Sequence, residues 1–265
     1  MKKLLIFALA LCLLLCACGD GNQSDNSEAE KSLSEAISVT NSETAFSGSY
    51  MLEINFGQGV SLYYANGTVE CTRTDKKASI AFAQTYLGVS ANRKNYIANG
   101  KAISVDGETA TEVDVDTNAL LSKFPYSQMF SLPEEVGEIA VNESMVGRTY
   151  TVTRNDTEII CDSVVGGDIY DMVDVLKQPQ KDKTEYGEAK CIYTVSEGRV
   201  TGVRYEFDVK LYDTPAYIPG YSVPESEYTI TLHITAKLSY DKFGGEVTVG
   251  EYSEGEEAQS KAVSE

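Results

Sequence analysis

The feature that most constrains the fold of this 265-residue chain is a strict alternation of apolar and polar residues in three long segments. In residues 46–56, 203–211 and 228–238, apolar side chains recur at every second position, with polar side chains between them. Since successive side chains of a strand point to opposite faces, each segment predicts a strand with one buried and one solvated face. Such strands are typical of antiparallel sheets, because the strands of parallel sheets are covered on both faces.

Weaker strand patterns fill much of the remaining chain, and short Gly-containing turns separate some of them. The weaker strands are predicted near residues 60–71, 78–87, 94–98, 102–106, 148–154, 158–163 and 190–196. Dipeptides that favour hairpin turns are Asn66-Gly67, Asn99-Gly100, Asp106-Gly107 and Glu197-Gly198. The chain between its two polar ends therefore reads as one sheet-based domain.

Three segments show helical spacing. In residues 29–41, apolar side chains recur every three or four positions, and residues 118–130 and 168–176 show shorter versions, the last capped by Asp168. One long apolar sheet face with about three helices to cover it predicts an α+β fold, in which a strongly curved antiparallel sheet, or half-barrel, wraps around the helices. Any part of that face left uncovered would form a groove for a hydrophobic ligand.

Aromatic side chains on the apolar faces of the strands are the candidates for lining such a groove. Tyrosine is frequent, with 17 copies, and its ring offers an apolar wall with a polar tip. The ligand-lining candidates are Tyr50, Phe56, Phe82, Tyr205 and Phe207. If the helices seal the sheet completely, these residues are ordinary core residues instead, since strands favour aromatic side chains in any case.

The N-terminus has the features of a secretory signal. Lys2 and Lys3 precede an almost entirely apolar run from Leu4 to Cys16, which is too short for a comfortable membrane span. The sequence Leu15-Cys16-Ala17-Cys18-Gly19 resembles a bacterial lipobox, although Cys16 stands where a small or aliphatic residue is preferred. The resemblance implies that a diacylglyceryl group is attached to Cys18 and that the chain is cleaved before it. The alternative is an ordinary signal peptide cut elsewhere.

These features predict the domain organisation. Residues 1–17 are a lipoprotein signal peptide, 18–28 a flexible tether from lipidated Cys18, 29–252 a single domain, and 253–265 an acidic disordered tail. The lipidated Cys18 would hold the domain on the extracytoplasmic face of the cell membrane, since several acyl chains give a stable anchor. The predicted membrane contact is therefore the anchor itself.

Composition excludes several classes of function. The chain has 22 basic against 40 acidic residues, a net charge of −18, so we expect no nucleic-acid partner. His233 is the only histidine and lies on the polar face of its strand, which argues against nucleophilic catalysis and histidine metal sites. We expect no enzyme activity, no catalytic residues, no cofactor and no metal.

An acidic run and three cysteines are weaker candidates for function, and both have simpler explanations. Glu112, Asp114 and Asp116 would share a strand face and could hold a calcium ion weakly. The later positions of a calcium-binding loop are absent, however. An acidic, solvent-exposed face that leads into a helix cap is therefore the simpler interpretation. Beyond the lipobox, Cys71, Cys161 and Cys191 fit no metal or redox spacing. They are expected as buried core residues, with a disulfide among them as the alternative.

The order of these elements resembles the LolA/LolB-like half-barrel lipoproteins, a group that includes LppX-like lipid-binding proteins. The stretches that carry the resemblance are residues 33–56, 95–106, 191–211 and 230–249. The resemblance implies that the concave face binds or carries a lipid or another hydrophobic molecule. The alternative function is an envelope protein-protein interaction, scaffold or sensor module, with a fully packed half-barrel and a partner-binding patch in the loop from Tyr212 to Pro224.

Overall fold

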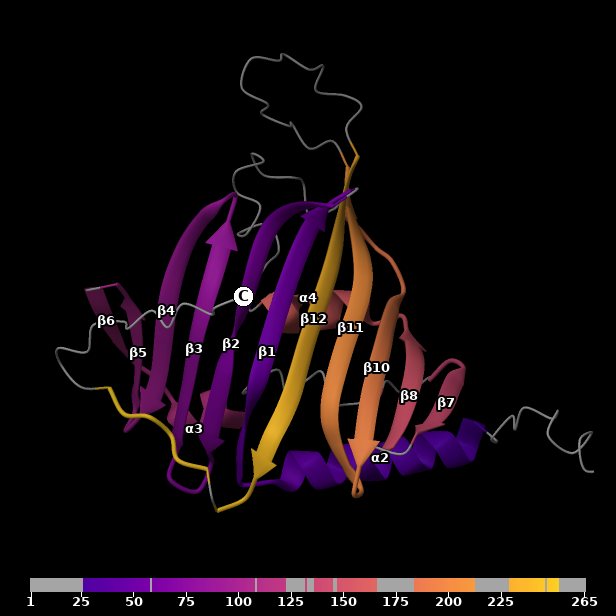
Figure 1. The fold of residues 1–265 in the computed structure, drawn as a ribbon, viewed down its shortest axis with the longest axis horizontal. Coiled ribbons are helices and arrows are strands. Elements are labelled where there is room, and N and C mark those ends of the chain that lie inside the picture. The colour runs from indigo at the N-terminus through magenta and orange to yellow at the C-terminus, as the bar shows by residue number, and fades with distance from the viewer. Residues whose placement is uncertain are drawn as a thin grey trace, which may run out of the picture.

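The computed structural model of the chain describes residues 26–57, 59–107, 109–122, 132, 136–144, 147–165, 184–212, 229–245 and 247–252. In these residues, twelve strands form one antiparallel sheet and three helices lie against it (Figure 1). The helices are α2 (Asn26–Ser42), α3 (Thr117–Ser122) and α4 (Thr157–Val165). The predicted α+β class with an antiparallel sheet is confirmed.

The sheet consists of two antiparallel sets of strands that meet in the middle. The first set is β1 (Ala45–Phe56), β2 (Val60–Thr72), β3 (Lys77–Tyr86), β4 (Val89–Ala98), β5 (Lys101–Asp106) and β6 (Thr109–Asp114). The second is β7 (Ile139–Ser144), β8 (Gly147–Arg154), β9 (Thr184–Tyr186), β10 (Ala189–Ser196), β11 (Arg199–Leu211) and β12 (Ile230–Phe243). The strand order is β6-β5-β4-β3-β2-β1-β12-β11-β10-β8-β7, and β9 pairs with β11. The pairing of β1 with β12 therefore joins the two sets into one sheet.

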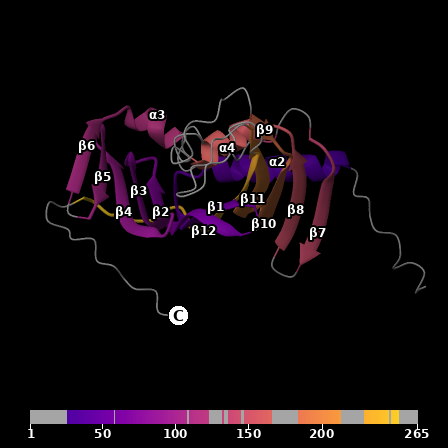
Figure 2. The same ribbon diagram turned by 90° about the horizontal axis from the view of Figure 1, so that it is seen from above.

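The helices occupy one side of the sheet, which we call the helix face (Figure 2). Figure 2 also shows the outer strands at both ends turned toward that side, but the sheet is not strongly curled. The strong curvature predicted from the sequence is therefore wrong in degree. Two of the described helices, α3 and α4, are short, so the layer that they form gives the sheet little to wrap around.

Helix α2 confirms the amphipathic pattern in the sequence, although it begins at Asn26 rather than at Ala29. Its buried residues are Ala29, Leu33, Ala36, Ile37 and Thr40, at the predicted spacing. The Thr40 hydroxyl donates to the Ala36 carbonyl at 2.9 Å and accepts the Val200 backbone N–H at 2.8 Å. That second bond attaches the end of α2 to the start of β11.

The central strands follow their sequence pattern closely. In β11, Val203, Tyr205, Phe207, Val209 and Leu211 are all buried, and the first four lie opposite buried residues of β12. The polar side chains between them lie on the other face of the sheet, where Lys210 pairs with Glu185. The core therefore lies between the helix face of the sheet and helices α2 and α4.

Residues 158–163, predicted as a strand, lie in helix α4. The buried positions of this helix are Thr157, Ile160, Cys161 and Val164, which is helical spacing. The first turn closes when the Ile160 N–H donates to the Asp156 carbonyl at 3.2 Å. The prediction failed because a short apolar run does not by itself distinguish a buried strand from a helix.

The predicted turn at Asn66-Gly67 is also wrong, since both residues lie inside β2. The three other predicted turns are confirmed: Asn99-Gly100 joins β4 to β5, Asp106-Gly107 follows β5, and Glu197-Gly198 joins β10 to β11. Position 67 requires a glycine for a different reason. A Cβ atom there would lie only 2.1 Å from the Ala81 carbonyl oxygen of β3. The residue is glycine because β2 and β3 approach closely, and not because the chain turns.

Several predictions fall outside the described residues. The helix predicted for residues 118–130 is described only as α3, and the helix predicted at 168–176 is not among the described residues. The same holds for the signal peptide, for Cys18 and most of the tether, and for the acidic tail. Strands β6, β7 and β9 were not predicted. Within the described residues, no helix has the length and apolar character needed to cross a bilayer.

Candidate functional site

The helix face has two unequally covered halves. On the half formed by β10, β11 and β12, the apolar side chains are sealed beneath α2 and α4. The Tyr205 side chain is 0% exposed and that of Phe207 is 5% exposed. These two predicted ligand-lining residues therefore lie in the packed core.

The other half, on β1, β2 and β3, is only partly covered. This half also contains buried side chains, such as Leu52, Ile54 and Val69, but a set of apolar side chains on the same face retains some exposure. We call this set the open strip; it consists of Tyr50, Phe56, Tyr63, Ile80, Phe82 and Tyr86. Helix α3 is the described helix that contacts β3, and it has only six residues. A short helix covers little of the strands below it.

Three of the five predicted ligand-lining residues belong to the open strip: Tyr50, Phe56 and Phe82. The rings of Tyr50 and Phe82 lie 6.1 Å apart between centroids, at an interplanar angle of 70°. Sequence reasoning missed Tyr63 and Tyr86, which pair across β2 and β3 on the same face. The Tyr63 hydroxyl donates to the Gln84 side chain at 3.2 Å, so its polar tip has a partner within the strip.

At one end of the open strip, two neighbouring hairpin turns expose large apolar side chains. We call Val60, Leu87 and Val89 the hairpin tips; their exposed fractions are 65%, 46% and 73%. Strands β1 and β3 both end at this edge of the sheet, as their arrowheads in Figure 1 show. The Leu87 N–H donates to the Leu62 carbonyl at 3.0 Å and so links the two turns. The sequence pattern predicted only the end of a strand near residue 87, and it did not predict the apolar turn Tyr86-Leu87-Gly88-Val89.

A polar cluster is buried in the closed half, beside α4. Arg154 is 1% exposed; its Nε donates to Asp156 at 2.8 Å and its Nη1 donates to the Tyr193 hydroxyl at 3.2 Å. Burial by itself would lower the pKa of Arg154. The hydrogen bonds to Asp156 and the electrostatic interactions with Tyr193 and Tyr205 outweigh this effect and raise the pKa above its usual value, so the guanidinium stays charged. Burial raises the pKa of Tyr205 well above its usual range. The cluster is therefore one buried cation held by a carboxylate and neutral phenols.

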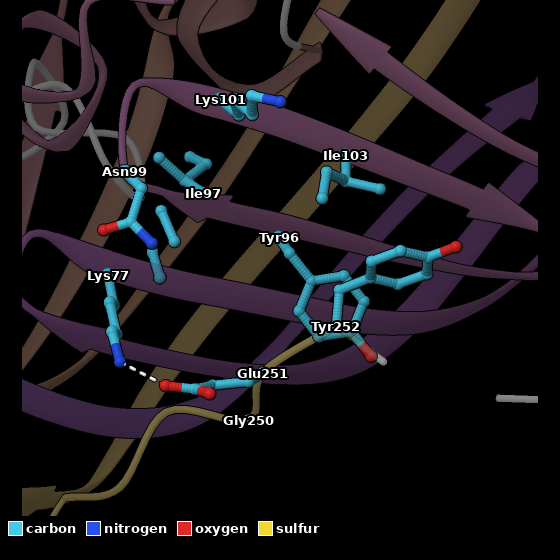
Figure 3. Close-up of a pocket in the computed structure, with 11 residues that line it drawn as sticks. Lys77, Tyr96, Ile97, Asn99, Lys101, Ile103, Gly250, Glu251 and Tyr252 are labelled. Atoms are coloured by element: carbon cyan, nitrogen blue, oxygen red, sulfur yellow. Dashed lines mark hydrogen bonds and ion pairs between the residues drawn. The ribbon is translucent and has the colours of Figure 1, made fainter. Parts of the chain in front are cut away.

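The face opposite the helices carries a pocket, which we call the back pocket (Figure 3). Its volume is about 190 Å³, and it lies between strands β3 to β5 and the C-terminal residues 247–252, which we call the strap. The Tyr252 ring of the strap lies 5.9 Å from the Tyr96 ring of β4, and Glu251 pairs with Lys77 of β3. Gly250 donates its N–H to Glu70 of β2 at 3.2 Å. No local sequence pattern predicted this site, because its walls come from distant segments.

The remaining candidates from the sequence have structural explanations. Cys71, Cys161 and Cys191 are buried and no disulfide joins them, and burial raises the pKa of Cys71 to about 11 and that of Cys191 to about 12. His233 is exposed on the polar face and contacts Asp208. Within the described ranges, no group of three or more His, Cys, Asp or Glu side chains could hold a metal ion.

The acidic run before α3 serves as a helix cap. The Asp116 carboxylate accepts the backbone N–H groups of Asn118 at 3.0 Å and Ala119 at 3.1 Å. Such a cap satisfies donors that the first turn of a helix leaves without partners. Glu112, for its part, pairs with Lys101 on the neighbouring strand.

Comparison with family models and with curated protein sequences found no match. Among solved structures, LprF from Mycobacterium bovis aligns with a TM-score of 0.40 and 11% identity, over 85% of this chain and 97% of LprF. The Mycobacterium tuberculosis lipoprotein LppX aligns with a TM-score of 0.39 and 10% identity, over 83% of this chain and 97% of LppX. A LolA superfamily protein from Nitrosomonas europaea aligns with a TM-score of 0.28 and 8% identity, over 85% of this chain and 94% of its own.

LppX and LolA are also names in the group that the sequence resembles. At these TM-scores the likeness concerns the general path of the chain.

Proposed function

We propose that this chain is a lipid-anchored envelope protein, held through Cys18 on the extracytoplasmic face of the cell membrane, that binds a hydrophobic molecule on the open strip. The observation that carries the proposal is the unequal burial of one continuous sheet face. The alternation that is sealed on β11 is left partly exposed on β3. Contact with water costs roughly 25 cal/mol per Å² of apolar surface, so an apolar occupant of the strip would be stabilised.

The chemistry of the open strip fits a long or flat apolar molecule. Five of its six members carry aromatic rings, namely Tyr50, Phe56, Tyr63, Phe82 and Tyr86. Aromatic walls with few polar groups are typical of sites for hydrophobic ligands. Tyr63 already satisfies its hydroxyl within the protein, so binding would not leave that polar group without a partner.

The hairpin tips supply independent support, because Leu87 holds an unfavourable backbone conformation. Its φ angle is +46°, a region that non-glycine residues rarely adopt and that asparagine tolerates better. The equivalent position of the β4–β5 turn is Asn99, with a φ angle of +55°. Leucine at position 87 is thus unfavourable in two ways: its backbone conformation is strained and its apolar side chain is exposed to water. An apolar contact made in function would explain why leucine is present, and we propose that the hydrophobic molecule enters the strip past the tips.

The test uses the chain from Cys18 to Glu265 with Cys18→Ser, so that no acyl group is attached; we call it the unacylated chain. We expect native mass spectrometry of this protein from a bacterial host to show a reproducible added mass that extracts into organic solvent. Phe82→Ser should remove most of that mass. The matched control is Tyr64→Ser, because Tyr64 lies on β2 but on the opposite face.

A chain that stays bare after incubation with envelope lipid extract would contradict the proposal. An added mass that survives Phe82→Ser would also contradict it, because the molecule would then be bound elsewhere. The bare chain would favour the alternative of a protein-binding module, whose predicted patch in residues 212–224 lies almost wholly outside the described residues.

A further inference from the structure

The back pocket is separate from the open strip and lies on the opposite face of the sheet. Figure 3 shows the strap crossing the strands, with Tyr252 over Tyr96 and Glu251 directed toward Lys77. With a volume of about 190 Å³, the pocket is smaller than the usual range for drug-sized ligands. Its size suits a single small ring and does not suit an acyl chain.

The charged groups around the back pocket are matched in pairs. Lys77 pairs with Glu251, and Lys101, on the other side of the pocket, pairs with Glu112. Each ammonium is thus paired with a carboxylate, and Asp75 and Asp114 also lie near Lys77 and Lys101, so the pocket offers no unpaired cation to an anion. The pairs still present hydrogen-bond donors and acceptors side by side, as do Asn99 and the tyrosine hydroxyls.

The other walls of the back pocket are apolar or aromatic. Ala98 and Ile103 form the apolar part, and the rings of Tyr96 and Tyr252 lie at an angle of 53° to each other. The site therefore combines aromatic surface with paired polar groups and no unpaired ammonium group. A sugar ring has the complementary pattern, with C–H faces that pack on aromatic rings and a rim of hydroxyls that both donate and accept.

We propose that the back pocket binds one ring of a neutral saccharide, with Tyr96 and Tyr252 against the sugar and the Lys77–Glu251 pair hydrogen-bonded to its hydroxyls. Two of these residues, Glu251 and Tyr252, belong to the strap. The site is complete only when the strap is docked, through the buried side chain of Val249 and the bond from Gly250 to Glu70. Saccharide binding is therefore coupled to strap docking, since a ligand that binds only the docked form stabilises it.

The test is ligand-observed NMR on the unacylated chain, with glucose, galactose and N-acetylglucosamine as neutral probes and glucuronate and glucosamine as charged ones. We expect saturable binding of at least one neutral sugar in the millimolar range, and weaker binding of both charged sugars. Tyr252→Ala should weaken the neutral sugar at least about tenfold, because it removes one wall. Tyr64→Ala is the matched control, since Tyr64 is a β2 tyrosine of the same face that does not line the pocket.

A second variant tests the charge argument separately. Glu251→Gln leaves Lys77 without its carboxylate, so glucuronate should bind this variant more tightly than it binds the parent chain. Absence of saturable binding by all three neutral sugars, or full binding by Tyr252→Ala, would overturn the proposal. Equal binding of glucuronate to Glu251→Gln and to the parent would overturn the assigned role of the ion pair. None of these readouts depends on a hydrophobic molecule in the open strip.

Discussion

Tyr50 of β1 and Phe82 of β3 meet across a strand that separates them, because the residue between them is Gly67. Gly67 is the register partner of both residues, so the three lie in one row on the helix face. The rings are 6.1 Å apart in an edge-to-face arrangement. Aromatic pairs of this geometry contribute about 0.5–1.5 kcal/mol beyond the surface that they bury. A side chain at position 67 would separate the rings and push against β3.

Gly67→Ala is expected to destabilise the protein by about 1–3 kcal/mol, the usual cost of overpacking a filled site. The added Cβ would lie 2.1 Å from the Ala81 carbonyl oxygen, and backbone must move to accommodate it. Gly202→Ala is the control. Gly202 lies in β11, another central strand, and the nearest atom to its added Cβ would be the Leu238 carbonyl oxygen at 3.6 Å. Urea unfolding of both variants measures the difference. Equal stability of the two would show that the close approach at Gly67 has no energetic consequence.

Exchange of turn residues should separate stability from ligand binding. Leu87→Asn is expected to stabilise the protein by up to about 1 kcal/mol, because asparagine tolerates the left-handed conformation at +46°. It should also reduce the added hydrophobic mass in native mass spectrometry, because the tip loses its apolar side chain. The reverse change, Asn99→Leu, should destabilise the protein without affecting that mass. If Leu87→Asn kept the full mass, the tip would have no part in binding.

The Arg154–Asp156 pair should be sensitive to loss of its carboxylate. Asp156→Asn is expected to cost about 3 kcal/mol, the lower end of the range for breaking a buried ion pair, since Tyr193 also binds the guanidinium. The matched control is Asp208→Asn, which breaks the exposed contact with His233 and should cost less than about 0.5 kcal/mol. Chemical denaturation of both variants at pH 7 gives the comparison. Similar losses would mean that burial of Arg154 adds nothing to the pair.

The Arg154 hydrogen bonds lower the pKa of Asp156, which gives the same pair a pH dependence. A carboxylate with a lowered pKa stabilises the fold above its ordinary pKa, and this stabilisation is lost as the pH falls through the folded value. The parent chain should therefore lose more stability than Asp156→Asn when the pH is lowered below about 4.

The buried thiols should make the fold less stable in alkali. Burial raises the pKa of Cys71 to about 11 and that of Cys191 to about 12. Below the ordinary thiol pKa both folded and unfolded chains keep the proton, but above it the unfolded chain releases protons that the folded chain retains. Stability should therefore fall as the pH rises above about 9, by up to about 1.4 kcal/mol per pH unit for each thiol.

Thiol labelling gives a direct check of this prediction. At pH 8, a disulfide reagent should react slowly with Cys71 and Cys191 in the folded unacylated chain and rapidly in urea. Cys191→Ala should show a shallower loss of stability between pH 9 and about pH 11 than the parent chain. Rapid labelling of the folded chain would contradict the burial of these thiols.

Local patterns predicted most of the sheet but could not place its exceptions. The alternation in residues 203–211 predicted β11 because strand periodicity is a property of neighbouring residues. Asn66-Gly67 has the composition of a turn, yet it lies in β2. Its glycine is needed because the backbone of Ala81 in β3 lies too close for a side chain. Residues 157–165 form a helix because their buried side has helical spacing, which the short apolar run Ile159-Ile160-Cys161 did not reveal.

The candidate site was predictable in kind but not in position. The sequence named five aromatic residues for the apolar face, and all five lie on it. Tyr205 and Phe207 lie beneath α2 and α4, whereas Tyr50, Phe56 and Phe82 lie where the helical cover is incomplete. The extent of that cover depends on how the helices dock, and alternation within a strand carries no information about it.

The sequence by itself determined which side of each long strand is apolar, where α2 lies, and that an acidic chain of net charge −18 forms an antiparallel sheet. These properties follow from the spacing and charge of neighbouring residues. Only the tertiary structure decided that β1 pairs with β12, that Arg154 is buried beside Tyr193, and that Tyr252 covers Tyr96. Each of these contacts joins residues far apart in the chain. Such contacts form because buried polar groups need partners and apolar faces need cover, and the folded chain as a whole decides which residues supply them.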